Sequence, residues 1–487
     1  MHGPADARGR FLACLAPSLP RTLGARMVFS SNIFLFVFLP LFLASYYLTP
    51  WRWKSLHILV FSYGFYAWWR PDFLALLVGV TVGSYAVALA IGAAADKAGK
   101  RRWLTLGVAA NLAALAYFKY ANFGMDSLNA VLGWVGAPAI AFTHVLLPIG
   151  LSFYIFHAIS YLVDIYREEA PPARNLIDFA AFIALFPHLV AGPVLRYHLL
   201  AEQFRARVHS LERFSRGSVV FMVGLCKKVL IADSVAPLAD AAFSAAHPSL
   251  ADAWLGALAY TVQLFFDFSG YTDMAIGLAL MIGFVFPENF NDPYVSKSIT
   301  EFWKRWHMSL SNWLREYLYI SLGGNRHGVV RTYINLFLTM LLGGLWHGAN
   351  WTFVVWGAWH GGILALERYW ESRFGPSRLP GVVRVAKTML LVIVGWVFFR
   401  AADMAGAWRM LKGMAGLQGF ELTAHMQWQV VPERLGVLAL GVALVYAMPW
   451  LRRTRGSVLR YALIPLFLWA VATLSAQAFT PFLYFQF

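Results

Sequence analysis

Charged residues are scarce in this sequence. Of its 487 residues, 13% are Asp, Glu, Lys or Arg, whereas 59% are hydrophobic. Soluble globular proteins have about 25% charged and 45–50% apolar residues. A chain of this length with roughly half the usual charge is therefore predicted to lie in a lipid bilayer rather than to fold around a large soluble core.

Cysteine and several well-known catalytic motifs are also rare or missing. The only two cysteines are Cys14 and Cys226, so neither a disulfide framework nor a cysteine metal site is predicted. We find no Walker motif, no G-x-G-x-x-G after a strand, no H-E-x-x-H and no G-x-S-x-G. These absences argue against ATP-driven transport, dinucleotide chemistry, zinc hydrolysis and α/β-hydrolase catalysis, and we assign no metal.

The formal net charge is +16, but the basic residues are not distributed as in a nucleic-acid-binding protein. The basic residues form short clusters between apolar runs, as expected for cytoplasmic loops under the positive-inside rule. The 20 Trp and 21 Tyr fit aromatic belts at the two membrane interfaces. We therefore expect the bilayer, and no nucleic acid, as a partner.

Twelve apolar runs approach the ~20 residues that a helix needs to cross a bilayer. The predicted fold class is therefore all-α: a polytopic integral membrane protein with about 12 transmembrane helices plus re-entrant and interfacial helices. The runs lie at about 30–49, 55–68, 72–95, 103–121, 143–166, 217–233, 254–286, 332–349, 350–370, 383–399, 434–450 and 458–478.

The distribution of Lys and Arg predicts the orientation of these runs. The loop at 122–142 has no Lys or Arg and is expected outside, whereas the basic stretches 167–174 and 196–216 are both expected in the cytoplasm. The apolar run 176–195 between those stretches cannot then cross once. It contains the helix breaker Pro187 and is predicted to be a re-entrant hairpin.

Residues 1–26 differ from the rest of the chain. They contain four arginines, which the span count would place on the outer face against the charge rule. We therefore regard residues 1–26 as a doubtful N-terminal extension and expect the protein to start at Met27. Residues 27–487 are predicted to form one transmembrane domain.

The segment 287–331 is rich in charge and tryptophan. A stripe with helical spacing predicts one helix that lies along the interface or lines a cavity, with His307 beside the stripe. The stripe consists of Trp303, Trp306, Leu310, Trp313 and Tyr317. From this pattern alone, His307 could equally be a catalytic group or an interfacial histidine bound to water.

Ionisable groups inside apolar runs are functional candidates because burying them is costly. His347 follows two glycines at the end of such a run and could accept a proton from a hydroxyl nucleophile, although a histidine bonded between helices is the alternative. His360, thirteen residues on, would point about 220° away on one helix, so the two form no metal pair.

A second polar group interrupts the run 254–286 and includes Asp267 and Asp273. These carboxylates are expected either to pair with a basic residue such as Lys227 or Lys228 or to line a polar cavity. We predict that four residues contribute to substrate binding: Asp267, Trp306, Arg315 and Asn350.

Two stretches together resemble the core of the membrane-bound O-acyltransferase family. They are EFWKRWHMSLSNWLREYLYISLGGNRHG at 301–328 and NLFLTMLLGGLWHGANWTFVVWGAWHG at 335–361. The likeness extends from Met27 to Phe487 through FYAWWRPDFL, YFKYANF, LLPIGLSFYIF, FPHLVAGPVLR, FFDFSGYTDMAIG, ENFNDPY and SAQAFTPFLYFQF, which are similar to members that acetylate exported bacterial polysaccharides.

The resemblance implies the fold of that family, His347 as the catalytic histidine and His307 as the second one. It implies acetyl-CoA as a cytoplasmic donor, no permanently bound cofactor, a multi-pass location in the bacterial inner membrane, and alginate mannuronate as the final acceptor with periplasmic acetylation proteins as partners. His157 stands where relatives have Glu or Gln, so it receives no role. The alternatives are acetylation of another polysaccharide such as cellulose, or transport of a polysaccharide precursor.

Overall fold

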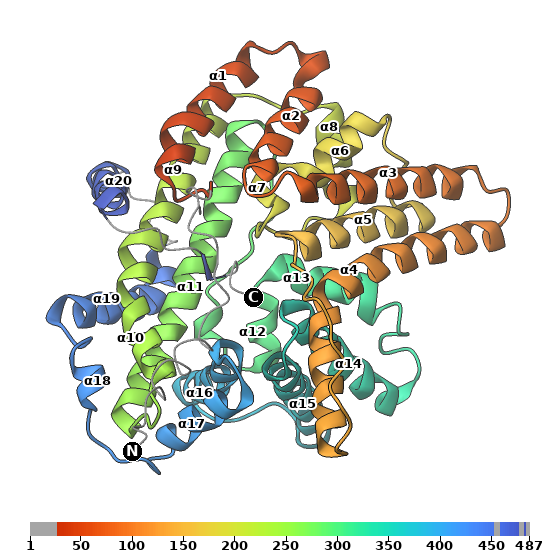
Figure 1. Ribbon diagram of the computed structural model, residues 1–487. Coiled ribbons are helices and arrows are strands. Elements are labelled where there is room, and N and C mark those ends of the chain that lie inside the picture. The colour runs from red at the N-terminus through yellow and green to blue at the C-terminus, as the bar shows by residue number, and fades with distance from the viewer. Residues whose placement is uncertain (1–26, 452–457, 477–481, 484–487) are drawn as a thin grey trace, which may run out of the picture.

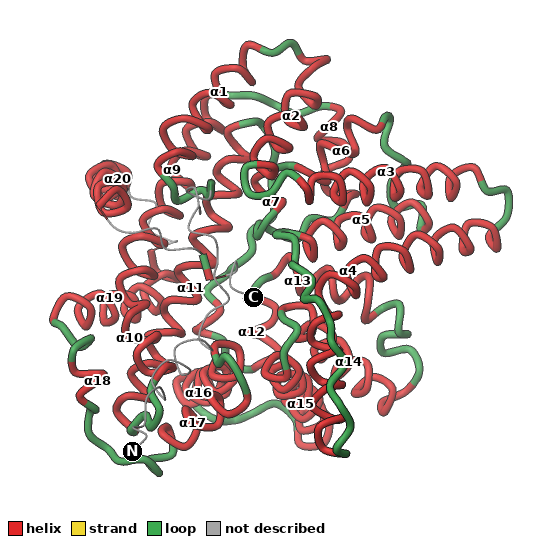
Figure 2. The backbone as a smooth tube through the Cα atoms, viewed as in Figure 1, coloured by secondary structure: helices red, strands yellow, loops and turns green. Residues whose placement is uncertain are grey.

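The computed structural model describes residues 27–451 and 458–476 together with Phe482 and Leu483, so the segment 1–26 lies outside the described residues. In these ranges the regular structure is helical, and the one β-bridge, between Leu417 and Gly419, is isolated (Figure 2). The predicted all-α fold class is confirmed.

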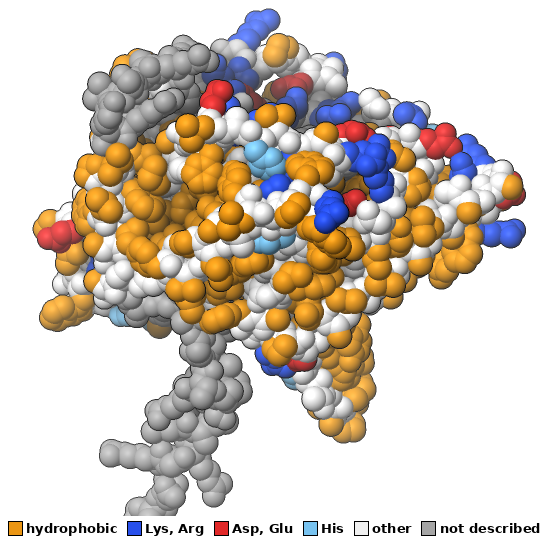
Figure 3. All heavy atoms as spheres, turned by 90° about the horizontal axis from the view of Figure 1, so that it is seen from above, with side chains coloured by type: hydrophobic (Ala, Val, Ile, Leu, Met, Phe, Trp, Pro, Cys, Tyr) orange, Lys and Arg blue, Asp and Glu red, His pale blue; other side chains and the backbone are white. Residues whose placement is uncertain are grey.

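Five helices are long and apolar enough to cross a membrane: α3 (Asp72–Ala93), α4 (Lys97–Trp134), α14 (Gly328–His347), α16 (Gly381–Arg400) and α19 (Pro432–Leu451). Three shorter apolar stretches are helical at Phe34–Leu48, Leu151–Tyr166 and Ala462–Ala476. Hydrophobic side chains are spread widely over the face in Figure 3, and most of the visible Lys and Arg lie toward its upper and right-hand parts. The molecule is therefore a multi-pass membrane protein; the number of twelve crossings stays a prediction.

The N-terminal third extends from the π-helix η1 to α5. Its first apolar run is split between η1 and α1, and α4 is longer than predicted, because the helix continues through the first half of the segment 122–142 that we expected to be a loop. At 1.5 Å per residue, α4 is about 57 Å long. The remaining elements are η1 (Phe34–Phe38), α1 (Leu39–Leu48), η2 (Trp51–Trp53), α2 (Lys54–Ala67) and α5 (Leu151–Tyr166).

Helices α9 (Leu211–Cys226) and α11 (Leu250–Met281) pack side by side in the centre of the molecule, with η3 (Lys227–Ala232) and α10 (Asp233–Ser244) continuing α9 (Figure 1). Glycines let the two backbones meet. A Cβ atom on Gly217 would lie 2.6 Å from the Gly277 oxygen, and one on Gly224 would lie 2.5 Å from the Gly270 oxygen. Small residues at contacts are the usual way that membrane helices associate.

The predicted re-entrant segment forms two short buried helices, α6 (Leu176–Ala184) and α7 (Phe186–Leu189), before the loop that leads to α8 (Tyr197–Arg205). Neither is long enough to cross a bilayer. Helix α6 ends before Leu185, and the Phe186 N–H donates to the Ser62 hydroxyl at 3.1 Å. This agrees with a segment that enters the protein and does not cross it.

The prediction of one continuous helix in the Trp-rich segment is wrong. The chain forms η4 (Pro293–Val295), α12 (Ile299–Arg305), α13 (Met308–Trp313) and the π-helix η5 (Leu314–Tyr319), and it breaks at His307, whose φ of 44° is left-handed. A backbone hydrogen bond to the preceding loop enforces the break, because the Met308 N–H donates to the backbone oxygen of Asn289 at 2.9 Å. The aromatic stripe is nevertheless mostly buried.

The C-terminal part is dominated by the pair α14 and α15 (Trp351–Phe374), which meet at Gly344 and Gly357. A Cβ atom on Gly344 would lie 2.3 Å from the Phe353 oxygen. The later helices are α16, α17 (Met404–Met414), α18 (Ala424–Gln427), α19 and α20 (Val458–Ala476).

Candidate active site

His347 is the last residue of α14, and a neighbouring helix holds this helix end in place. The ammonium group of Lys119 in α4 donates to the backbone oxygens of Trp346 and, at 3.2 Å, of His347, and the Tyr120 hydroxyl donates to the Leu345 oxygen at 2.7 Å. The last carbonyls of a helix lack partners within it and favour a positive charge. Lys119 and Tyr120 therefore fix the position from which the His347 side chain projects.

The His347 ring lies in an aromatic enclosure. Its centroid is 5.2 Å from that of Trp356 and 5.1 Å from that of Phe399, and the side chain is buried. The ring of His307 is 6.5 Å away, centroid to centroid. The structure thus brings together the two histidines that the sequence singled out, from segments forty residues apart.

His307 is held by a polar network from the loop after α11. Its Nδ1 lies 3.1 Å from Oδ1 of Asn289, and the same oxygen accepts bonds from the backbone N–H of Ser309 at 3.1 Å and from its hydroxyl at 2.8 Å. The Val194 N–H, from the loop after α7, donates to Ser309 Oγ at 2.9 Å. Burial lowers the pKa of His307 to about 3, so its ring is neutral.

A cavity of about 510 Å³ lies on one side of the site. Its lining comes from the second half of α4 and from the turn between α14 and α15, and it includes Lys119, Asn122, Asp126, Asn350 and Trp351. Asn122 and Asp126 belong to the segment that the charge rule places outside. This cavity therefore reaches the helix end that carries His347 from the predicted outer face.

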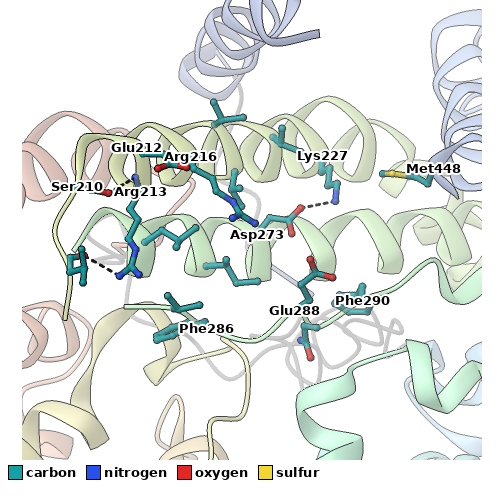
Figure 4. A pocket seen from close by; sticks show the side chains of 18 residues that line it. Ser210, Glu212, Arg213, Arg216, Lys227, Asp273, Phe286, Glu288, Phe290 and Met448 are labelled. Carbon is teal, nitrogen blue, oxygen red and sulfur yellow. Dashed lines mark hydrogen bonds and ion pairs between the residues drawn. The ribbon is translucent and has the colours of Figure 1, made fainter. Parts of the chain in front are cut away.

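A second cavity, of about 790 Å³, lies between α9, α11 and the loop that follows α11 (Figure 4). Arg213, Arg216 and Lys227 line it together with Asp273 and Asn289. The two arginines belong to the stretch predicted to be cytoplasmic. The cavity therefore lies toward the predicted cytoplasmic face, and Asn289 in its wall contacts His307.

The two lysines after Cys226 form separate ion pairs. Lys227 pairs with Asp273 at 2.6 Å in the cavity wall, whereas Lys228 is buried and pairs with Asp233 at 2.5 Å and with Asp267 at 2.9 Å. Asp267 also accepts the Leu483 N–H at 3.0 Å. The expected pairing of carboxylates with basic residues is thus observed, and Asp267 lines neither cavity.

The other predicted binding residues occupy different places. Trp306 is buried against Phe290, at 5.0 Å between ring centroids, and Phe290 lines the cavity of about 790 Å³. Asn350 lines the outer cavity, where its side chain caps α15 at the Thr352 N–H. Arg315 is exposed and lines neither cavity. Their roles in binding stay predictions.

His360 is buried away from both cavities. It packs against Trp303 and Trp356 at 5.1 Å each, and neither ring nitrogen has a hydrogen-bond partner within residues 27–451, 458–476 and 482–483. Trp356 thus contacts both His347 and His360. His360 contributes to the aromatic packing behind His347.

One group outside this site has donor atoms close enough to hold a metal ion. It comprises Asp164, Glu169 and His198, whose ligand atoms lie within 4.8 Å of one another. The Asp164 carboxylate already accepts bonds from the Tyr317 hydroxyl at 2.5 Å and from His198 Nδ1 at 3.0 Å. The His198–Asp164 bond raises the pKa of His198, so the group is accounted for as a hydrogen-bonded ion pair.

Two residues of the site, Lys119 and Asn289, were not predicted from the sequence. Lys119 is a lone charge in an apolar run, the same signal that drew attention to Asp267, so the rule on ionisable groups in membranes could have found it. Asn289 has no such signal, because its role depends on a loop folding against a distant helix start.

Comparison with known proteins identifies the family. The model of the membrane-bound O-acyltransferase family matches residues 141–413, which include the whole of α14 and both histidines. The chain belongs to this family. It is therefore an O-acyltransferase rather than a transporter of a polysaccharide precursor, and the family resemblance of the sequence is confirmed.

Relatives of this acyltransferase have named activities. Two proteins named probable alginate O-acetylase AlgI, from Azotobacter vinelandii and Pseudomonas putida, are 52% and 53% identical, and each match covers 95% of this chain and all of the relative. A peptidoglycan O-acetyltransferase from Helicobacter pylori is 38% identical over 81% of each chain. Both kinds of relative are named for acetylation of a glycan polymer.

Proposed function

We propose that this protein is an inner-membrane O-acetyltransferase that transfers acetyl groups from cytoplasmic acetyl-CoA toward exported alginate, in cooperation with periplasmic acetylation proteins. The proposal depends on the pair His347 and His307, whose rings lie 6.5 Å apart. Each contacts a residue that lines one of two cavities: Asn289 at His307, in the cavity toward the predicted cytoplasmic face, and Lys119 at His347, in the cavity toward the predicted outer face. The names of the most similar relatives favour alginate as the final acceptor.

The cytoplasmic cavity suits a donor that carries phosphate groups. Arg213 donates to the backbone oxygens of Val208 and Gly283, whereas Arg216 has no ion-pair partner within 4 Å in the described part of the chain. Figure 4 shows the Arg216 and Asp273 side chains in the same cavity. Guanidinium groups bind phosphate well, so Arg216 is the proposed anchor of the donor.

The proposed reaction uses His347 as the base. His347 accepts the proton of the acceptor hydroxyl, the oxygen attacks the thioester carbonyl, and the carbon–sulfur bond breaks. The thiolate of coenzyme A leaves and takes up the proton from the histidine. The net products are the acetyl ester and free coenzyme A, with no covalent intermediate on the protein.

We propose about twelve membrane crossings. This number requires spans beyond the five long apolar helices, for example through α9 and α11.

A second candidate acceptor is another glycan, as the Helicobacter pylori relative illustrates. Acetyl analysis of the exported polymer distinguishes these acceptors.

Sealed membrane vesicles test the side from which the donor enters. Radiolabelled acetyl-CoA does not cross a bilayer, so inverted vesicles, whose cytoplasmic face is outward, should incorporate label, and right-side-out vesicles should not. Arg216→Gln should raise the KM for acetyl-CoA at least ~5-fold, whereas Arg378→Gln, at an exposed position outside both cavities, should leave it unchanged. Equal labelling in both orientations would contradict a cytoplasmic donor.

A further inference from the structure

Asn289 is part of the wall of the cytoplasmic cavity and also contacts the second histidine. The residue is 2% exposed and belongs to the loop between α11 and η4. It is one of the residues that line the cavity, and its Oδ1 accepts three hydrogen bonds, from His307 Nδ1 and from the N–H and hydroxyl of Ser309. One end of the amide is therefore fully engaged with the start of α13, while the residue also forms part of the cavity wall.

The Ser309 backbone fixes which end of the amide faces His307. A backbone N–H can only donate, so the atom it bonds must be the amide oxygen and not the nitrogen. An amide oxygen can only accept, so His307 Nδ1 must carry the hydrogen. In the neutral ring the lone pair then resides on Nε2, which makes Nε2 the basic atom of His307.

The other end of the amide, Nδ2, is a buried donor without a hydrogen-bond partner in the part of the chain that the structure describes. Buried polar groups in native proteins are nearly always hydrogen-bonded, so a buried donor beside a cavity calls for a partner such as a ligand or a water molecule. Because Asn289 lines the cavity with Arg216, a ligand in that cavity is the natural partner for these N–H groups.

We propose that Asn289 is a catalytic residue whose Nδ2 donates a hydrogen bond to the carbonyl oxygen of the acyl donor, while its Oδ1 holds His307 in the Nδ1–H form. This proposal depends on the proposed function. When the acceptor oxygen attacks the carbonyl carbon, the C=O electron pair moves onto the oxygen, where the amide N–H stabilises the developing charge. The C=O bond re-forms as the carbon–sulfur bond breaks, and Asn289 itself is unchanged.

The test measures kcat and KM for acetyl-CoA in membranes that contain Asn289→Ala, Asn289→Asp or Asn291→Ala. Removal of one such donor typically lowers kcat by ~10²–10³-fold, so Asn289→Ala should lose kcat with little change in KM. Asn291→Ala is the matched control, because Asn291 is exposed in the same loop and lines neither cavity. It should retain wild-type kcat.

Asn289→Asp separates catalysis from folding, since a carboxylate keeps the three accepted bonds and loses only the donor. It should be as abundant as the wild type and still lose kcat. The carboxylate beside Nδ1 should also raise the pKa of His307, so activity should fall toward acidic pH in this variant more steeply than in the wild type. The neighbouring His347 is common to both proteins and does not produce the difference.

Asn289→Asp with wild-type kcat and pH profile would overturn the role of Asn289. If His347→Ala abolishes transfer while both Asn289 variants retain it, only this inference fails. If His347→Ala is also active, the proposed function fails instead.

Discussion

Replacement of Gly357 by alanine should separate the two helices that present His347. The added Cβ atom would lie 2.6 Å from the Met340 oxygen and 2.9 Å from the Leu341 Cα, where ordinary contact begins at 3.4 Å. Both opposing atoms are backbone, so α14 and α15 must move apart by about 0.8 Å. Overpacking of this kind costs about 1–3 kcal/mol. A catalytic group misplaced by about 1 Å loses roughly 10²-fold in rate.

Gly362→Ala is the matched control in the same helix, because its Cβ atom would meet nothing within 4 Å. Both variants gain the same helix propensity, about 1 kcal/mol in favour of alanine, so a difference between them isolates the clash. The assay combines thermal unfolding in detergent with acetyl incorporation from labelled acetyl-CoA. Gly357→Ala should have a lower Tm and at least ~10-fold lower activity than Gly362→Ala. Equal values for the two variants would refute the packing argument.

Three further predictions concern charged groups. Lys119→Met should abolish acetylation, because it removes charge-assisted bonds worth about 1.5–3 kcal/mol each from the helix end at His347; full activity in complemented cells would contradict this. The pKa of His198 is raised by its bond to Asp164, so protonated His198 stabilises the protein fully below the unfolded pKa of about 6.5. This stabilisation is lost as the pH rises through the folded pKa, so the Tm of the wild type should fall over that range. The Tm of His198→Asn should not show this fall. Asp267→Asn should lower membrane abundance by destabilising a buried ion pair by about 3–5 kcal/mol, and normal abundance with lost activity would instead favour a binding role.

The sequence predicted the membrane character and the all-α class, because these depend on composition. Its local motifs also singled out His347 and His307, whose rings lie 6.5 Å apart in the structure, while their catalytic roles stay predictions. It did not predict the break at His307. A histidine with positive φ is uncommon, and here it is enforced by the Met308–Asn289 backbone bond across nineteen positions of the chain. The helical spacing of the tryptophans continues through the break and so concealed it.

The cavities and their polar contacts were also beyond the sequence. Asn289 and Lys119 act on the histidines through contacts between segments that are distant in the chain, as between Lys119 and the His347 oxygen. The apolar run that became α4 showed where a helix would form but not which helix end it would support. Such contacts depend on tertiary packing, which a single sequence does not encode in a readable pattern.

The most direct test of the account is the acetyl ester content of exported polymer in an alginate-producing strain that lacks its own O-acetylase and carries His347→Ala. The matched control is His327→Ala, an exposed histidine at the other end of α14. With both proteins present at wild-type levels in membrane blots, we predict no acetyl ester with His347→Ala and normal acetylation with His327→Ala. Normal acetylation with His347→Ala would contradict the central role of His347.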